Sequence, residues 1–375
     1  MAENNSLKNY PIHEIPECLI HGRTDLTGEA VPLFWNGSGL ELCVSGSELW
    51  IDLEAGYEQY EPWISCEING AFITRQMLMP GRQSLCLFRG MSPGEKKTVF
   101  FRREVQAFHE DEKNYLLICG VRTDGEFFPV RERKYKLEFV GDSITSGEGT
   151  YGAKSDNDWL PMYMSVSVNY ADMVGKAMNA ELRLISQCGF GVYCGYDNDV
   201  RHVMPAYYDQ ICGVAFGEHN RSLGAAKPYD FSSWIPDAVI IHLGTNDDVA
   251  FDNPPFIDPD TGKYYKIRKN SEINNDLNQS DVKRIRTAVI SFLRHLRKKN
   301  PKSLLLWVYG MIGHRLSMPI ASAVLDYIEQ TGDLRAAFLE LPDTPEENLG
   351  SRLHPGQAAH EKAAEIIVEY LKKNL

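Results

Sequence analysis

The sequence predicts a two-domain protein of the α/β class, in which an all-β sandwich precedes a domain built on a mostly parallel sheet. Three observations support this prediction. Short alternating strands separated by turns fill the first third of the chain, and apolar strands alternate with amphipathic helices after it. The length of 375 residues also exceeds the usual size of a single domain. We expect the two domains to span residues 1–132 and 133–375.

The prediction of a sandwich rests on the strand pattern between residues 12 and 130. Apolar residues alternate with polar or small ones at 40–44 and at 49–53, on either side of a Ser-Gly-Ser turn. Asn69-Gly70 joins two further apolar runs, and this pair accepts the positive φ values that a two-residue hairpin turn requires. Several short strands at this spacing are typical of a β-sandwich.

The pattern changes after residue 133 to strands alternating with longer helices. This alternation is typical of a mostly parallel sheet that is covered on both faces. In one predicted helix the apolar side chains recur along a single stripe, as expected for a helix packed on a sheet. The predicted strands are 137–140, 182–185, 238–243, 304–309 and 337–341, and the predicted helices are 169–179, 282–299 and the segment after Pro355.

The segment 247–280 does not fit this alternation. It is rich in Asp, Asn, Pro and Gly and is too long for an ordinary connection between a strand and a helix. It also follows the carboxyl end of a predicted strand, which is where α/β sheets bind their ligands. We therefore expect it to be a functional loop or a mobile lid.

Composition and charge exclude several classes of partner. The formal net charge is −12, whereas nucleic acids and anionic membrane surfaces require a clustered positive footprint. The first ten residues lack the apolar stretch of a secretory signal, and no window has the length and hydrophobicity of a membrane span, so we expect a cytoplasmic protein. The eight cysteines include no Cys-x-x-Cys pair, which indicates free thiols and implies no zinc or redox site.

The strongest local motif is Phe139-Val140-Gly141-Asp142-Ser143, at the end of the first predicted strand of the α/β domain. A strand that runs into Gly-Asp-Ser places a serine hydroxyl on a tight turn at the carboxyl edge of the sheet, where a substrate can approach. Such tripeptides also occur by chance in ordinary turns. Its position after an apolar strand makes Ser143 the candidate nucleophile.

Two further motifs follow predicted strands and reach the same edge of the sheet. One strand ends in Gly-Thr-Asn-Asp, which brings the amide of Asn246 to that edge, and glycines follow another strand at 189 and 191. An amide N–H that donates to the developing oxyanion stabilises the transition state and raises the rate strongly. A glycine lets a backbone N–H face a ligand, because no side chain of its own is in the way. The alternative is an Asx turn or a plain strand-to-helix turn.

A histidine completes the candidate site. His354 stands before a proline and the last predicted helix. A lone histidine is more often a surface or packed residue than a catalytic one, but the other motifs require a base. The ring of His354 is able to take the proton of Ser143 at neutral pH.

In this order, the four motifs resemble the blocks of the SGNH (GDSL) hydrolase superfamily: Gly-Asp-Ser, a glycine, Gly-x-Asn-Asp and a C-terminal histidine. The resemblance implies a three-layer parallel-sheet hydrolase domain with Ser143 as nucleophile and His354 as general base. It further implies that the oxyanion donors are the backbone N–H of Gly189, in preference to Gly191, and the side-chain amide of Asn246.

Within the superfamily, the sequence is most similar to carbohydrate esterase family 2, the acetyl-xylan and acetyl-glucomannan esterases. That family has an N-terminal jelly-roll sandwich, so the resemblance implies a jelly roll for residues 1–132. It also implies a serine esterase that removes O-acetyl groups from plant-polysaccharide-derived xylo- or manno-oligosaccharides through an acyl-enzyme, without a metal or cofactor. The stretches that carry the likeness are 34–39 (Phe-Trp-Asn-Gly-Ser-Gly), 141–145 (Gly-Asp-Ser-Ile-Thr) and 234–237 (Trp-Ile-Pro-Asp).

The sequence leaves two other functions open. A short-chain lipase or thioesterase on the same scaffold would need an apolar acyl channel in place of a small acetyl pocket. A catalytically inert carbohydrate-binding protein would use the sandwich alone, although the presence of all four motifs argues against it. The sugar, the hydroxyl position and the formation of a homo-oligomer stay open as well.

The sequence departs from the superfamily at the acid of the catalytic triad. An aspartate two or three residues before the histidine usually holds the imidazole in the correct tautomer, but Arg352 and Ser351 occupy these positions. Some members of carbohydrate esterase family 2 resemble this in working as a Ser–His dyad, with a backbone carbonyl that orients the ring. The resemblance therefore implies a dyad here, and we expect a main-chain carbonyl near Ser351 to orient His354. The alternative acids, which require the loop to fold back, are Asp343, Glu346 and Glu347.

Overall fold

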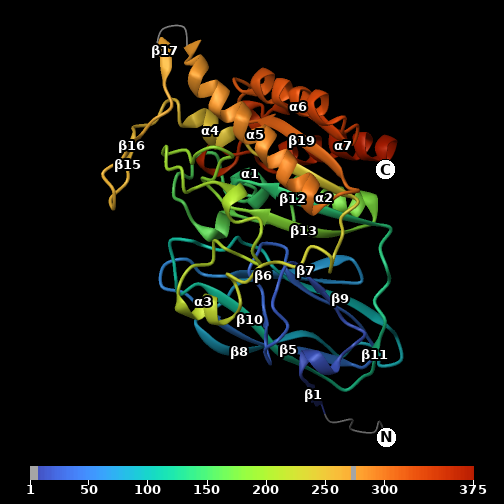
Figure 1. Ribbon diagram of the computed structural model, residues 1–375. Helices are drawn as coiled ribbons and strands as arrows, with labels where there is room; N and C mark the ends of the chain where they lie inside the picture. Colours follow the sequence, from blue (N-terminus) through green and yellow to red (C-terminus); the bar gives the residue numbers. More distant parts are fainter. Residues whose placement is uncertain (1–6, 272–275) are drawn as a thin grey trace, which may run out of the picture. The chain divides into compact units, whose positions relative to one another are not determined.

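The computed structural model describes residues 7–271 and 276–375 and divides the chain into two compact units (Figure 1). The first unit contains residues 1–133 together with the short segments 160–162 and 210–229. The second unit contains residues 134–159, 163–209 and 230–375. Among residues 7–271 and 276–375, no helix combines the length and apolar composition that a membrane span requires.

The first unit contains two antiparallel sheets. In one sheet the strand order is β1-β10-β5-β8, with β3 also paired to β10, and in the other it is β11-β4-β9-β6-β7, with β2 paired to β4. The first sheet comprises β1 (Lys8–Tyr10), β3 (Val31–Pro32), β5 (Glu48–Gly56), β8 (Gly81–Arg89) and β10 (Tyr115–Thr123). The second comprises β2 (Leu19–His21), β4 (Gly39–Val44), β6 (Trp63–Ile68), β7 (Ala71–Met77), β9 (Lys97–Arg103) and β11 (Phe127–Phe128).

The two sheets share one apolar core. Residues of β5 alternate between buried and partly exposed positions, and the buried ones join those of β4, β6, β9 and β10 in a single cluster. Because the side chains of a strand point to alternate faces of its sheet, this pattern means that one face of each sheet is buried against the opposite sheet. The predicted hairpin turn is confirmed, because Asn69 and Gly70 have φ values of 53° and 78° between β6 and β7.

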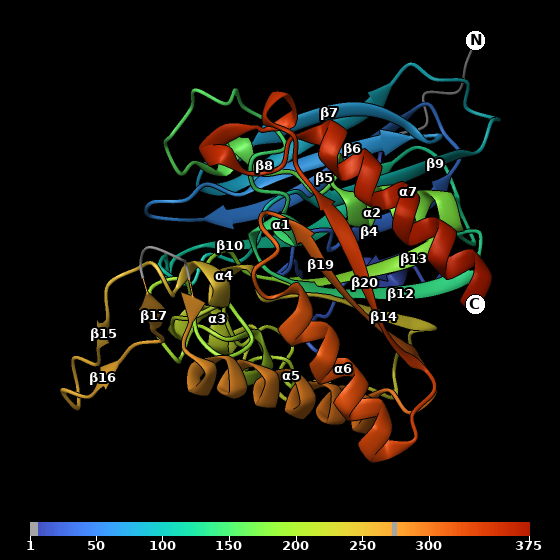
Figure 2. The ribbon, with the colours of Figure 1, turned by 90° about the horizontal axis from the view of Figure 1, so that it is seen from above.

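The second unit is built on a five-stranded parallel sheet with the order β13-β12-β14-β19-β20. Helices α5 and α6 lie on one side of this sheet, and α2 and α7 lie on the other (Figure 2). All five predicted strands and the three predicted helices are confirmed, whereas α6 was not predicted. The strands are β12 (Tyr135–Gly141), β13 (Ala180–Ser186), β14 (Ala238–His242), β19 (Leu304–Met311) and β20 (Ala336–Asp343). The long helices are α2 (Tyr170–Met178), α5 (Gln279–Lys299), α6 (Ser317–Thr331) and α7 (Gln357–Asn374).

The described part of segment 247–280 is held by hydrogen bonds at its base. The buried amide of Asn198 donates to the carbonyls of Ala250 and Pro254, at 2.9 Å each. The ammonium group of Lys266 donates to the carbonyls of Ala250, Phe251 and Asn253. These bonds fix the chain that follows α4 (Thr245–Val249), and the remainder of the predicted loop at 272–275 lies outside the described residues. The segment also forms β15 (Phe256–Ile257) with β16 (Tyr264–Tyr265), and β17 (Lys269–Ser271) with β18 (Asp276–Leu277).

Candidate active site

Ser143 stands at the sharp turn between β12 and the short helix α1 (Ser143–Ser146). The side chain of Asp142 caps this helix by accepting the N–H of Ile144 at 3.1 Å. A glycine is required at position 141, because a Cβ there would lie 2.0 Å from the hydroxyl oxygen of Thr145. The turn therefore presents the Ser143 side chain at the carboxyl edge of the sheet, as predicted from the Gly-Asp-Ser motif.

His354 contacts Ser143 directly. Its Nε2 atom lies 3.0 Å from the hydroxyl oxygen of Ser143, and its Nδ1 atom lies 3.1 Å from the backbone carbonyl oxygen of Arg352. When Nδ1–H donates to this carbonyl, Nε2 is left as the acceptor for the serine proton. The prediction that a main-chain carbonyl near Ser351 orients the imidazole is confirmed.

The backbone that supplies this carbonyl is strained. Arg352 and Leu353 have φ values of 52° and 57°, a region that side-chain-bearing residues rarely adopt. Each such residue costs on the order of 1 kcal/mol or more and persists only where the surrounding contacts enforce it. Here the strained turn places the Arg352 carbonyl within hydrogen-bond distance of Nδ1 of His354.

Glu148 is a charged residue of this site that the sequence analysis missed. Its buried carboxylate lies 3.6 Å from Nε2 of His354 and accepts a hydrogen bond from the guanidinium of Arg352. The signal in the sequence is its place between two glycines directly after the nucleophile turn. A Cβ at Gly149 would lie 2.5 Å from Cβ of His354, so this glycine lets the chain pass close beneath the histidine.

The three alternative acids lie elsewhere. In the part of the chain that the structure describes, the polar partners of His354 are Ser143, Arg352 and Glu148. The carboxylate of Asp343 accepts the N–H of Gly313 at 2.8 Å, and that of Glu346 pairs with Lys154. Neither Asp343, Glu346 nor Glu347 has an ion pair or hydrogen bond to His354.

Asn246 and Gly189 come together at a second turn. The side-chain amide of Asn246 donates to the carbonyl of Phe190 at 2.9 Å, which uses one of its two N–H groups. Gly189 has a φ of 80° and leaves its backbone uncovered by any side chain of its own. Ser186 is the last residue of β13, directly before this turn, and its hydroxyl accepts a hydrogen bond from the hydroxyl of Ser146 in α1 at 3.0 Å. The turn therefore adjoins the helix that carries Ser143.

Asp247 fixes the loop that follows Gly189. Its buried carboxylate accepts the N–H groups of Val192, Tyr193 and Cys194 at 2.7 to 3.0 Å, and burial raises its pKa to about 6. A Cβ at Gly191 would lie 2.4 Å from the same carboxylate, so Gly191 is required for packing. Gly191 is therefore needed because of its close contact with Asp247, and Gly189 stays the predicted oxyanion donor.

Two other histidines of the second unit are buried and held neutral. Burial lowers the pKa of His242 to about 4 and that of His360 to about 3. The ring of Tyr170 stacks on His360 at 5.9 Å and meets His242 edge-on at 5.7 Å. Tyr170 in turn contacts the hydroxyl of Thr145 in α1 at 2.7 Å, whereas His354 is in direct contact with Ser143.

Asp197, Asp199 and His202 form the group of potential metal ligands found among the described residues. The carboxylate of Asp199 is already paired with Arg201, whose Nη2 lies 2.7 Å from it. A metal ion would have to compete with this guanidinium for the carboxylate of Asp199. His202 lies 3.4 Å from the carboxylate of Asp197, so the contacts that the structure shows in this group are those of ion pairs.

Comparisons with known proteins find relatives that are named as esterases. No family model matches the chain. An acetyl xylan esterase, Est2A from the rumen bacterium Butyrivibrio proteoclasticus, is 49% identical, with a TM-score of 0.95 and 98% coverage of both chains. A family two carbohydrate esterase from Clostridium thermocellum, solved in complex with cellohexaose, has a TM-score of 0.76 at 20% identity and covers 95% of this chain and 98% of that one.

A curated relative is longer than this chain. Cellulase/esterase CelE of Acetivibrio thermocellus is 22% identical over 97% of this chain, which spans 40% of the length of CelE. The serine turn, the histidine and the parallel sheet define an SGNH-type hydrolase. Within that superfamily, the chain belongs to carbohydrate esterase family 2.

Proposed function

We propose that this protein is a serine esterase that removes O-acetyl groups from xylo- or manno-oligosaccharides through an acyl-enzyme. The observation that carries the proposal is the 3.0 Å contact between Nε2 of His354 and the hydroxyl of Ser143, with Nδ1 held by a carbonyl. The substrate class follows relatives named as an acetyl xylan esterase and as an acetylxylan esterase / glucomannan deacetylase, the latter from Cellvibrio japonicus.

The reaction begins when the hydroxyl oxygen of Ser143 attacks the acetyl carbonyl carbon and its proton passes to Nε2 of His354. The backbone N–H of Gly189 and the second amide N–H of Asn246 stabilise the negative charge on the carbonyl oxygen. The C–O bond to the sugar then breaks, and the sugar oxygen takes the proton from His354. In the second half, water gives a proton to His354 and attacks the acetyl carbon. The bond between this carbon and the Ser143 oxygen breaks, acetate leaves, and the serine oxygen takes the proton back from His354.

Glu148 takes part of the role that an aspartate has in a triad. Its carboxylate lies beside Nε2 of His354 and stabilises the imidazolium that forms when the ring accepts the serine proton. Its bond to the Arg352 guanidinium also holds the residue whose carbonyl orients Nδ1. In a triad, one aspartate both orients the histidine ring and supplies a negative charge beside it. Here the Arg352 carbonyl orients the ring, and Glu148 supplies the negative charge.

The experiment that tests the proposal is acetate release from acetylated xylo- and manno-oligosaccharides, with Ser143→Ala as the matched control. A series of p-nitrophenyl esters of increasing acyl length is measured beside it. We expect acetate release by the wild type and a steep fall in rate beyond the shortest acyl chains. Rates that rise with acyl length would identify a lipase or thioesterase, and binding of the oligosaccharides without acetate release would identify an inert binding protein.

We also propose that residues 1–132 form a jelly roll and residues 133–375 the SGNH catalytic domain. The strand orders β3-β10-β5-β8 and β4-β9-β6-β7 support the jelly roll, because consecutive strands such as β4, β5 and β6 alternate between the two sheets. Alternation of this kind is typical of the two Greek keys of an eight-stranded jelly roll.

A further inference from the structure

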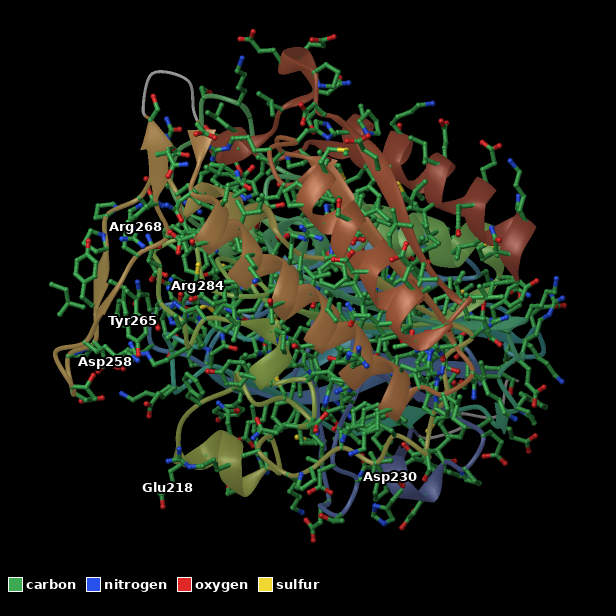
Figure 3. The ribbon with its side chains drawn as sticks, turned by 45° about the horizontal axis from the view of Figure 1, so that its top comes forward. Glu218, Asp230, Asp258, Tyr265, Arg268 and Arg284 are labelled. Atoms are coloured by element: carbon green, nitrogen blue, oxygen red, sulfur yellow. The ribbon has the colours of Figure 1, made fainter. Side chains whose placement is uncertain are left out.

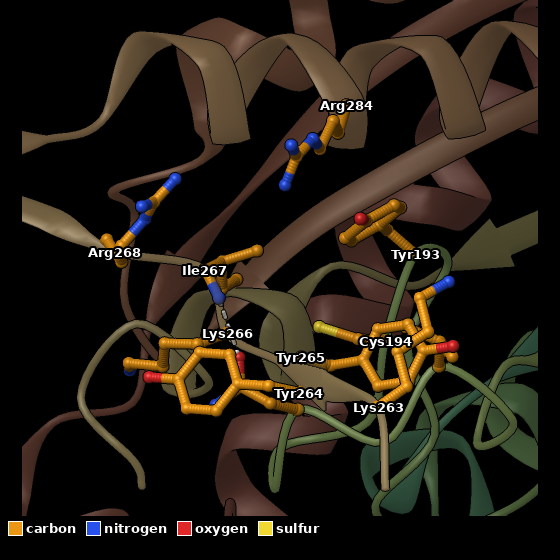
Figure 4. A pocket seen from close by; sticks show the side chains of 11 residues that line it. Tyr193, Cys194, Lys263, Tyr264, Tyr265, Lys266, Ile267, Arg268 and Arg284 are labelled. Atoms are coloured by element: carbon orange, nitrogen blue, oxygen red, sulfur yellow. Dashed lines mark hydrogen bonds between the residues drawn. The ribbon is translucent and has the colours of Figure 1, made fainter. Parts of the chain in front are cut away.

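The second unit contains a cavity of about 350 Å³ that none of the residues assigned to chemistry lines (Figure 4). This volume lies at the lower end of the range for small-molecule sites. One wall comes from Tyr193 to Val200 and the opposite wall from Lys263 to Arg268, with Arg284 of α5 above them. Tyr265, Arg268 and Arg284 lie beside one another where this part of segment 247–280 meets α5 (Figure 3).

The lining of this cavity carries an excess of positive charge in a chain whose net charge is −12. Four lining residues are basic and none is acidic. The buried carboxylate of Asp281 pairs with Arg284 at 2.8 Å and with Arg268 at 3.4 Å, so two guanidinium groups share one carboxylate. Both arginine side chains are more than half exposed, and each guanidinium offers five N–H donors. The pair is therefore equipped to bind a second carboxylate from outside.

Lys266 has a different role from the two arginines. All three of its N–H donors are engaged by backbone carbonyls after α4. Its charge contributes to the field of the cavity, while its hydrogen bonds support the wall. The donors that remain for a ligand belong to Arg268, Arg284 and Lys263.

Aromatic rings form the other part of the lining. Tyr193, Tyr264 and Tyr265 line the cavity, and Tyr264 is 61% exposed. The ammonium of Lys263 lies 4.8 Å from the centre of the Tyr265 ring, which holds that ring in place. A tyrosine offers both a flat apolar face and a hydroxyl, and such a lining suits a ring that has C–H faces and hydroxyl groups. A small inorganic anion would use the arginines and leave the tyrosines without contact.

The walls are preformed. The side-chain oxygen of Asn198 accepts the N–H of Ile267 at 2.9 Å, while its amide binds the chain after α4. On the other wall, the carboxylate of Asp247 holds the N–H groups of Tyr193 and Cys194. Because Asp247 follows Asn246 directly, the cavity wall is continuous with the loop of the proposed oxyanion site. A preformed site loses little conformational entropy when its ligand binds.

We propose that this cavity is a saccharide subsite that takes a uronic acid residue. Arg268 and Arg284 bind the sugar carboxylate in the fork geometry that guanidinium groups favour, and the tyrosines contact the sugar ring. The choice of a saccharide rests on the proposed esterase function, whereas the choice of a carboxylate rests on the paired arginines.

The test is a calorimetric titration of the Ser143→Ala variant with glucuronosyl-xylose and with glucosyl-xylose, neither of which carries an ester. These probes differ only by a carboxylate in place of a hydroxymethyl group. We expect the uronate to bind at least about tenfold more tightly, the difference that one charge-assisted hydrogen bond provides. Adding Arg284→Gln should abolish this preference. Arg286→Gln is the matched control, because Arg286 lies on the same helix and is also paired with an aspartate, Asp326.

Equal affinity for the two probes would overturn the proposal, as would equal losses from Arg284→Gln and Arg286→Gln. If inorganic phosphate binds the cavity as tightly as the uronate does, the cavity is a general anion site, and this result would also overturn the proposal. Tyr264→Ala provides a second variant with an exposed side chain, and it should weaken binding of the uronate severalfold. Turnover of p-nitrophenyl acetate by the Arg284→Gln and Tyr264→Ala single variants should equal that of the wild type. If no variant or wild type releases acetate while the uronate still binds, the proposed esterase function fails and the subsite stands.

Discussion

Replacement of Glu148 by Gln removes one charge from the site and keeps the size of the side chain. In the wild type, one carboxylate oxygen lies 3.6 Å from Nε2 of His354 and the other accepts a hydrogen bond from Arg352. The glutamine retains an oxygen for Arg352 but no longer attracts a positively charged imidazole. The variant therefore separates the electrostatic role of Glu148 from its role in holding Arg352.

The expected magnitude follows from Coulomb's law. Two unit charges 3.6 Å apart attract each other by about 5 kcal/mol at an effective dielectric constant of about 20, and by about 1 kcal/mol in water. The guanidinium of Arg352 contacts the same carboxylate and offsets part of this attraction. We therefore expect Glu148→Gln to lose about 2 kcal/mol of transition-state stabilisation, which corresponds to a fall in kcat of roughly thirtyfold.

The assay is steady-state hydrolysis of p-nitrophenyl acetate by the wild type, Glu148→Gln and the control Glu346→Gln. Glu346 is exposed and pairs with Lys154, away from His354, so its variant should keep the wild-type kcat. Near-ultraviolet circular dichroism confirms that each variant is folded. A kcat for Glu148→Gln within about twofold of the wild type would refute the electrostatic role.

Three further predictions follow from the site and its surroundings. Asn246→Ala should lower kcat by about a hundredfold or more with a smaller change in KM, because the amide acts mainly in the transition state; a change in KM alone would make Asn246 a binding residue. Alanine at Asp343, Glu346 or Glu347, singly, should leave kcat close to the wild-type value, and a loss of about four orders of magnitude at any of them would identify a hidden triad acid. His360→Gln should change acid stability, because burial lowers the pKa of His360 to about 3 and the unfolded chain binds that proton more readily. The free energy of unfolding of the wild type should therefore fall by about 3 kcal/mol between pH 7 and pH 4 because of this group. Urea denaturation at the two pH values measures this fall, and the His360→Gln variant should lack it.

The sequence predicts the elements of both units well because their signals are local. The alternation along β5 and the apolar run of β12 follow directly from burial on one face or on both faces of a sheet. The helix α6 was missed although Pro319 in its first turn and the left-handed Gly332 at its end are typical helix boundaries. Its buried residues Ile320, Val324 and Tyr327 are spaced like those of the predicted helices.

The site was predictable only where its parts follow recognisable turns. Ser143 and His354 each stand at the boundary of an element, so the sequence indicates both. The contact of Glu148 with Arg352 joins residues 204 positions apart, and no local periodicity reports such a contact. The left-handed backbone of Arg352 and Leu353 is equally hidden, because these residue types favour other conformations.

The central claim is that Ser143 carries the acetyl group during the reaction. The most direct measurement is rapid acid quenching of the enzyme during turnover of an acetylated xylo-oligosaccharide, followed by mass spectrometry of its peptides. The account predicts the added mass of one acetyl group on the peptide that contains Ser143, and none in the Ser143→Ala variant. An acetyl group on a different residue, or turnover by Ser143→Ala at a rate close to that of the wild type, would contradict it.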